Sequence, residues 1–193
     1  MDEEQKALEE RMTPEERELY QSFKERIGQE SIPQYNHDIF LPLLGEGEVT
    51  WSLIKKWAQV HGDLNPLWFD EEYAKQSRWK GIIAPPMFTL TIDPGKAPAA
   101  YPIGFLYKPA PNPVLNLEKY PTFRGSSQSD SEWEFFEPIR PGDTISVKTK
   151  FSDIYWKQGK RFRLLFTAGE TTYTNHRGQL VARCRLGAVY MFK

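Results

Sequence analysis

Three polar residues of one short segment carry side chains that can do acid–base chemistry. His61, Asp63 and Asn65 alternate along a stretch that reads H-G-D-L-N-P. Aspartate and histidine are among the residue types that act as general acids and bases, so Asp63 is a candidate for that role. Its alternative role is structural, because an aspartate between glycine and Asn-Pro caps turns well. Asn65 is more typical of a residue that holds a turn than of a catalyst.

The histidines of the chain are few and scattered. His61 is a candidate base, although it stands two residues from Asp63. His37 falls in a predicted strand or loop and His176 in a predicted turn, where we expect polar surface roles. Three such histidines and the single Cys184 do not have the spacing of metal ligands. We therefore expect no metal and no cofactor.

A second segment, I-I-A-P-P-M-F-T-L at residues 82–90, is apolar throughout. We predict a buried helix there, entered through two prolines. Two tryptophans close to it in sequence, Trp68 and Trp79, are candidates for the wall of an apolar tunnel. Ordinary packing in a core or an interface uses the same residue types, so both interpretations stay open.

The charges of the chain are balanced overall but unevenly distributed. The net charge is −1, which gives no global attraction to nucleic acid or to an anionic membrane. Residues 140–193 carry 11 bases and 3 acids, and a basic hairpin could meet the phosphates of a cofactor-like substrate. The candidates for that contact are Lys157, Lys160, Arg161 and Arg163. The alternative is a solvated hairpin.

Length and composition indicate a single-domain protein of the cytoplasm. A chain of 193 residues suits one domain with an extra arm. No apolar run approaches the roughly 20 residues of a membrane span, and the acidic N-terminus differs from a signal peptide. A single cysteine excludes an internal disulfide, which fits a reducing compartment.

Local signals predict helices in the first half of the chain. A capping box with proline at the first helical position begins a helix at residue 14. The apolar residues that continue it at a spacing of four are Leu19, Phe23 and Ile27. We assign residues 1–30 to a helical arm that packs on its own sheet or on a partner. Thr50 begins an amphipathic helix, residues 70–79 form a short one, and the proline-rich segment 94–121 is typical of a lid or an interface.

Period-two alternation predicts β-structure from residue 131 onward. Ile145, Val147 and Phe151 alternate with polar residues. Further long strands are predicted at residues 161–173 and 179–192. Helices first and antiparallel strands last indicate an α+β architecture, with one central apolar helix and a long curved sheet.

Four segments together resemble the MaoC-like family of enoyl-thioester hydratases. G-D-L-N-P-L at residues 62–67 is similar to the hydratase signature G-D-x-N-P-L-H. It is followed in order by I-A-P-P-M-F at 83–88, P-I-R-P-G-D-T at 138–144 and E-T-T-Y-T-N at 170–175. The resemblance implies a hot-dog fold over residues 31–193, in which an antiparallel sheet wraps a long helix. It also implies dimers or double hot-dogs, and (R)-specific hydration of a trans-2-enoyl thioester.

Two positions depart from the family pattern. Trp68 stands where the signature has histidine, and Pro86 stands where the family has a glycine whose N–H faces the thioester oxygen. Proline has no N–H, and loss of one such donor costs roughly 3–4 kcal/mol of transition-state stabilisation. Asp63 and Asn65 remain, but the acid–base pair and the donor do not.

The A-P-P variant resembles a subgroup of hot-dogs that do not catalyse alone. It is similar to the non-catalytic hot-dog of fungal dehydratases and to the substrate-binding subunit of heterodimeric mycobacterial acyl dehydratases. The resemblance implies a subunit that shapes the acyl channel for an acyl-CoA, while a second hot-dog subunit carries Asp and His. The residues expected to contact substrate are Trp68, Trp79, Ala84, Pro85, Pro86, Met87 and Phe88. A self-sufficient hydratase that uses Asp63 and His61, and a non-enzymatic acyl-thioester-binding module, are the alternatives.

Overall fold

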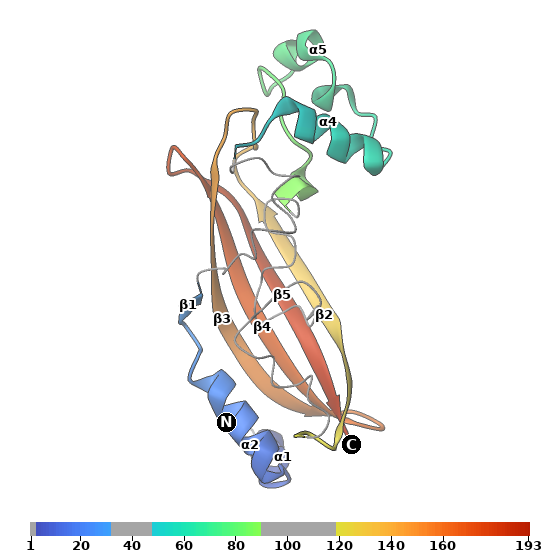
Figure 1. Cartoon of the computed structure of the whole chain (residues 1–193), viewed down its shortest axis with the longest axis vertical. Coiled ribbons are helices and arrows are strands. Elements are labelled where there is room, and N and C mark those ends of the chain that lie inside the picture. The colour runs from blue at the N-terminus through green and yellow to red at the C-terminus, as the bar shows by residue number, and fades with distance from the viewer. Residues whose placement is uncertain (1–2, 32–47, 90–118) are drawn as a thin grey trace.

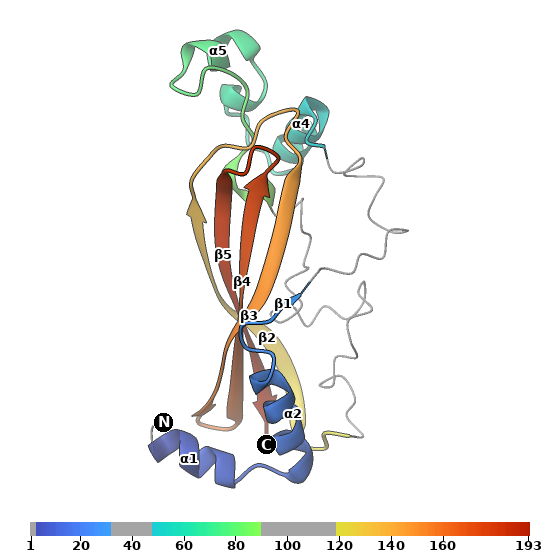
Figure 2. The same cartoon turned by 90° about the vertical axis from the view of Figure 1, so that its left-hand side faces the viewer.

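The structure, a computed structural model, describes residues 3–31, 48–89 and 119–193 (Figure 1). Five antiparallel strands form one sheet in the order β1-β3-β4-β5-β2. Four of them are long and curved, as Figures 1 and 2 show. The strands are β1 (Glu30–Ser31), β2 (Phe123–Phe135), β3 (Ile145–Gln158), β4 (Arg163–Asn175) and β5 (Leu180–Phe192). The α+β class and the long curved antiparallel sheet are therefore confirmed.

Side-chain alternation decides which face of the sheet is buried. In β4 the odd-numbered residues from Arg163 to Asn175 are buried, whereas most of the even-numbered ones are partly exposed. In β3 the register shifts between Phe151 and Asp153. This bulge keeps Phe151 and Ile154 on the same buried face although they are three residues apart.

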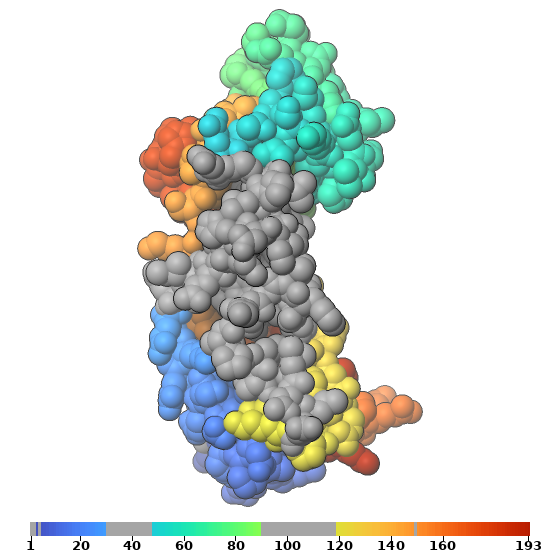
Figure 3. All heavy atoms as spheres, in the orientation of Figure 1, coloured from blue at the N-terminus to red at the C-terminus, as the bar shows by residue number. Residues whose placement is uncertain are grey.

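Helices lie at the two ends of the sheet and form two separate cores with it (Figures 2 and 3). At one end are α1 (Glu3–Glu10) and α2 (Pro14–Lys24), which we call the arm end. At the other end are α4 (Trp51–Val60), α5 (Glu71–Gln76) and two 3-10 turns, η1 (Pro66–Trp68) and η2 (Pro86–Phe88). We call this second end the pocket end.

The arm packs on its own sheet, one of the two partners expected for it. The capping box of α2 forms as predicted, since Thr13 and Glu16 exchange both hydrogen bonds. Phe23 stacks on Phe151 of β3 with ring centroids 5.5 Å apart. Ile27 departs from the prediction: α2 ends at Lys24, so Ile27 leaves the buried stripe and is 45% exposed.

Two further predictions differ from the structure. The apolar segment 82–90 is not one helix: residues 82–85 belong to no helix or strand, η2 follows as a single 3-10 turn, and the chain is helical at Thr89. Residues 82–85 are not helical because Ala84 N–H donates to the carbonyl of Ile139, at 2.8 Å, and each proline lacks the donor that a helix interior needs. Any continuation of the predicted central helix beyond Thr89 lies outside the described residues, as do most of segment 94–121 and His37. Strand β2 begins at Phe123, earlier than predicted.

Candidate functional site

The segment that carries His61, Asp63 and Asn65 forms a tight turn after α4. Asp63 Oδ1 accepts a hydrogen bond from the N–H of Asn65, at 3.1 Å. Asn65 Oδ1 accepts one from the N–H of Leu67, at 3.0 Å, and so caps η1. These are the bonds by which Asp and Asn side chains stabilise turns. Both side chains therefore hold the turn, which is the structural role that the sequence allows for them.

His61 is turned towards α4 rather than towards Asp63. Its Nδ1 lies 2.8 Å from the carbonyl oxygen of Trp57, and its ring stacks on the indole of Trp57 with centroids 3.9 Å apart. The described residues show no hydrogen bond between His61 and Asp63. The two side chains are therefore not arranged here as a pair that shares one water molecule.

Trp68 fills the position of the signature histidine and belongs to the core. It is 6% exposed and packs in the pocket-end core with Ile54 and Ala58. Its carbonyl accepts a hydrogen bond from Trp51 Nε1, at 2.9 Å. Its own indole N–H is buried and has no hydrogen-bond partner within the described part of the chain. An indole in this place cannot accept a proton from water, because it is a donor only.

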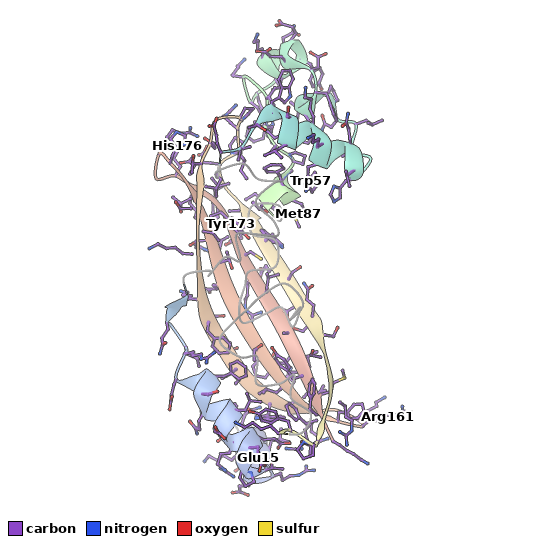
Figure 4. The ribbon with its side chains drawn as sticks, viewed as in Figure 1. Glu15, Trp57, Met87, Arg161, Tyr173 and His176 are labelled. Carbon is purple, nitrogen blue, oxygen red and sulfur yellow. The ribbon has the colours of Figure 1, made fainter. Side chains whose placement is uncertain are left out.

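A pocket of about 270 Å³ opens at this end, between the segment after α5, the A-P-P segment and the end of β2. Four of the residues expected to contact substrate line it: Trp79, Ala84, Pro85 and Pro86. Phe88 instead lies in the core, 1% exposed, with Trp57 edge-on at 6.4 Å. Met87, labelled in Figure 4 beside Trp57, and Trp68 are not among the lining residues.

The rest of the wall was not predicted from the sequence. Two aromatic side chains from the end of β2, Phe135 and Phe136, line the pocket and are 44% and 47% exposed. Phe135 stacks on Trp133 at 5.9 Å, and Trp133 meets Tyr173 of β4 at 5.8 Å. The signal that could have found them is an aromatic pair at a strand end just before a Pro-Gly turn. The remaining lining residues are Arg78, Ile83, Thr89, Glu137, Pro138, Ile139 and Val181.

The P-I-R-P-G-D segment holds the pocket wall in place. Asp143 is 1% exposed and accepts a hydrogen bond from the N–H of Arg140, at 2.8 Å. Its other oxygen lies 2.8 Å from Arg177 Nη1 and 3.6 Å from Nδ1 of His176, both in the turn between β4 and β5. Arg140 in turn donates from Nη2 to the carbonyl of Trp79, at 2.8 Å. A buried carboxylate thus ties two turns to the pocket wall.

Comparison with known proteins places these features in a family. Residues 45–184 match the family described as "FAS1-like, dehydratase domain region". The chain belongs to this family of FAS1-like, MaoC-like hot-dog dehydratases. The structure fits this membership. It superposes on a chain of the ChsH1-ChsH2 complex from Mycobacterium tuberculosis with a TM-score of 0.65 at 18% identity, covering 90% of this chain and 89% of that one.

Other proteins are similar to this chain in structure or in sequence. A MaoC-like dehydratase from Rhodospirillum rubrum superposes with a TM-score of 0.53 at 22% identity, over 76% of this chain and 86% of that one. A probable enoyl-CoA hydratase alpha subunit of Thermomonospora curvata is 29% identical over 75% of this chain. A UPF0336 protein of Parafrankia sp. is 31% identical over 67% of this chain and 74% of its own length. This chain spans 45% of the length of the Thermomonospora protein.

The basic residues that we expected to meet phosphates lie at the far end of this hot-dog. Lys157, Lys160 and Arg161 sit at or beside the β3–β4 hairpin, and Figure 4 shows Arg161 at the opposite end of the sheet from Met87 and Trp57. Strand β3 is 14 residues long, which is roughly 40 Å at the usual rise of a strand. They are therefore remote from the pocket.

Arg163 departs further from that expectation. It is 6% exposed, and its two terminal nitrogens donate to both carboxylate oxygens of Glu16, at 2.7 and 2.8 Å. A guanidinium buried in this bidentate pair is not available to a phosphate. Arg163 fastens the arm to the sheet instead.

The described ranges contain neither a cluster of metal ligands nor a membrane-spanning helix. No group of three or more His, Cys, Asp or Glu side chains there is placed to hold a metal ion. No helix of residues 3–31, 48–89 and 119–193 is long and apolar enough to cross a membrane.

Proposed function

We propose that this chain is the acyl-binding subunit of a heteromeric (R)-specific enoyl-CoA hydratase or acyl dehydratase. A partner hot-dog subunit would supply the catalytic Asp and His and the N–H that faces the thioester oxygen. The observation that carries this proposal is the pair of Trp68 and Pro86. One is buried in the core where the family has its base, and the other lines the pocket where the family has its donor.

The chemistry explains why both positions matter. Hydration adds water to the β-carbon while a proton reaches the α-carbon, so an acid–base pair must hold the water. Charge develops on the thioester oxygen, and a donor aimed at it stabilises that charge. An indole N–H cannot act as a base, and Pro86 has no N–H to donate. The remaining Asp63 is engaged with the backbone of Asn65.

The apolar pocket supports a role in binding the acyl group. Its wall is mainly aliphatic, proline and aromatic surface, including Phe135 and Phe136, which are almost half exposed. Apolar clefts with few polar groups are typical of small-molecule sites. The proposed substrate is a coenzyme A thioester, and the addition of water to it requires no further cofactor. We place the reaction in the cytoplasm, without nucleic acid or membrane.

The relatives support a subunit role. The Thermomonospora curvata relative is named as an alpha subunit of an enoyl-CoA hydratase. A Mycobacterium tuberculosis relative, 25% identical over 58% of this chain, is named as the alpha subunit of a 3-oxo-4,17-pregnadiene-20-carboxyl-CoA hydratase. The structural neighbour with a TM-score of 0.65 comes from a complex of two proteins. A name that specifies one subunit supports a function shared with a second chain.

The test is co-expression with a hot-dog protein that has the complete G-D-x-N-P-x-H signature. We expect a stable complex that hydrates a short trans-2-enoyl-CoA, measured as loss of enoyl absorbance, and no turnover by the isolated chain. The matched variant Trp68→His in the isolated chain should remain inactive, because Pro86 still lacks the donor.

Two outcomes would contradict the proposal. Turnover by the isolated chain at a typical enzymatic rate of about ten per second would assign the reaction to Asp63 and His61 in a self-sufficient hydratase. Tight binding of acyl-CoA without turnover in any mixture would instead indicate a non-enzymatic acyl-thioester-binding module.

A further inference from the structure

Arg78 is a charged hydrogen-bond donor in the wall of a mainly apolar pocket. Its guanidinium lies over the indole of Trp79, 4.3 Å from the ring centroid, and both residues line the pocket. Within the described residues no carboxylate lies within salt-bridge distance of Arg78. Every N–H of a guanidinium is a donor and none is an acceptor. The stacked guanidinium therefore has donors to offer to a ligand.

The backbone around Arg78 is held by a set of short-range hydrogen bonds. Ser77 Oγ accepts from the N–H of Trp79, at 3.1 Å, and donates to the carbonyl of Ala74, at 2.6 Å. The N–H of Gly81 also donates to Ala74, at 3.0 Å. Arg140 reaches across from the P-I-R-P-G-D segment to the carbonyl of Trp79. The position from which Arg78 extends is thus fixed from two sides.

Lys80 shows how tightly this turn is drawn. Its φ is 57°, in the left-handed region. Among the residues that the structure describes, no other residue except glycine has a positive φ. Side chains other than glycine avoid this region because Cβ approaches the following carbonyl. The surrounding structure must therefore impose the conformation. Lys80 itself does not line the pocket, which makes it a matched control for Arg78.

The other polar groups of the described pocket wall are less suited to donate. Thr89 is fully buried and its hydroxyl already donates to the carbonyl of Pro86, at 3.2 Å. Glu137 offers an acceptor when ionised. Pro86 has no N–H. The remaining side-chain donors of the described wall are the guanidinium of Arg78 and the indole of Trp79, on which it stacks. Of these two donors, only Arg78 is charged.

We infer that Arg78 donates a hydrogen bond to a carbonyl oxygen of the acyl ligand in this pocket and so determines which ligands bind. The inference rests on the proposed function, because it assumes that the pocket receives an acyl thioester. An apolar wall accepts the hydrocarbon part, and a charged donor at the same wall favours a ligand with an oxygen acceptor. That oxygen is either the thioester carbonyl or a second carbonyl further along the acyl group.

The experiment measures the affinity of the assembled complex for three coenzyme A derivatives by calorimetry. The first is hexanoyl-CoA, with a thioester carbonyl. The second is the thioether hexyl-CoA, which lacks it, and the third is a hexanoyl-CoA with a ketone near the end of its chain. Each is titrated into the unmodified complex and into complexes that carry Arg78→Met, Arg78→Lys or the control Lys80→Met.

We expect Arg78→Met to weaken binding of at least one carbonyl-bearing ligand by about tenfold to hundredfold, the usual effect of a hydrogen bond from a charged group. Arg78→Lys should restore part of it, since the charge and a donor return. Lys80→Met removes the same charge from the same turn and should change little. A loss for hexanoyl-CoA that is absent for hexyl-CoA assigns Arg78 to the thioester carbonyl, whereas a loss confined to the ketone ligand assigns it to the distal oxygen.

The contrary results separate the two claims. If Arg78→Met and Lys80→Met behave alike for every ligand while binding itself is intact, the inference about Arg78 is wrong and the proposed function stands. If the unmodified complex binds none of the three ligands, the proposed function fails, and the inference fails with it.

Discussion

The two ends of the sheet are built from the same strands but differ in how far each end covers its own side chains. At the arm end, Glu16 is 1% exposed and holds Arg163 through two hydrogen bonds, while Thr122 donates to the same carboxylate at 2.6 Å. Each end buries one indole N–H without a partner within the described residues, that of Trp156 at the arm end and that of Trp68 at the pocket end. The difference lies in two aromatic side chains of the pocket end, Phe135 and Phe136, which stay almost half exposed.

The arm end is covered by helices of the same chain, whereas the pocket end leaves aromatic surface open to a ligand or a partner. A buried charge pair with complete hydrogen bonding fixes how the arm sits on the sheet. Neighbouring exposed aromatics mark a surface that a ligand or a partner covers. The arm end is thus expected to respond to mutation mainly in stability, and the pocket end mainly in binding.

The largest effect is expected when the buried charge pair at the arm end is broken. Glu16→Ala leaves Arg163 buried without its counter-charge, which typically costs about 3–5 kcal/mol. We expect this loss in the free energy of unfolding measured by urea denaturation. The control is Glu18→Ala, which removes an exposed partner of Lys119 from the same helix and should cost at most about 1 kcal/mol. Equal losses in the two variants would mean that the buried pair does not hold the arm.

The second prediction concerns how the stability of the arm end depends on pH. Burial, together with a hydrogen bond from the side chain to Glu9, raises the pKa of Tyr20 to about 12. Burial also raises the pKa of Tyr120 and of Tyr190, and all three belong to the arm-end core. An unfolded tyrosine ionises near pH 10, so their contribution to stability is complete below about pH 10 and is lost as the pH rises towards the folded pKa.

The measurement is the free energy of unfolding at a series of alkaline pH values. Tyr20→Phe should reduce the slope of the decline above about pH 10, because the ionisable hydroxyl is gone. The substitution Tyr73→Phe, on a side chain that is 51% exposed in α5, controls for the loss of a hydroxyl. A slope that Tyr20→Phe leaves unchanged would show that this tyrosine does not link pH to the arm end.

The smallest expected effect concerns Asp63 at the pocket end. Asp63→Asn keeps an oxygen that can accept from the N–H of Asn65. We expect less than about a tenfold change in kcat of the assembled complex, because groups that act as a unit lose value once one is missing. A loss of about 10²–10⁴-fold, typical of a true acid or base, would return Asp63 to the catalytic residues.

The sequence predicts those parts of the fold whose signals are local. The capping box of Thr13 and Glu16, the cap at Thr50 and the alternation along β3 all appear as expected. The first half of β2 was missed because it reads G-S-S-Q-S-D-S, which lacks the β-branched and aromatic residues of typical strands. That part of β2 is a strand because it pairs with β5, some sixty residues later.

The candidate site was predicted in part for the same reason. A family motif located the A-P-P segment, and Trp79 was a candidate because it is a tryptophan close to that segment in sequence; both line one pocket. Phe135 and Phe136 carry no such motif and reach the pocket through the pairing of β2 with β5. We expected the basic residues of the β3–β4 hairpin near the substrate, but they lie at the other end of the sheet from the pocket. Sequence alone does not show at which end of a strand a ligand binds.

The strand order β1-β3-β4-β5-β2 has a consequence for synthesis of the protein on the ribosome. Strand β2 leaves the ribosome well before β5, its partner in the sheet. Until β5 has emerged, Phe135 belongs to a strand whose neighbour in the sheet is not yet in place. Pairing at such long sequence separation is slow, so the nascent chain displays its pocket-lining aromatics before it has a sheet. A chaperone or a partner subunit present at that stage would meet these residues before the sheet has formed.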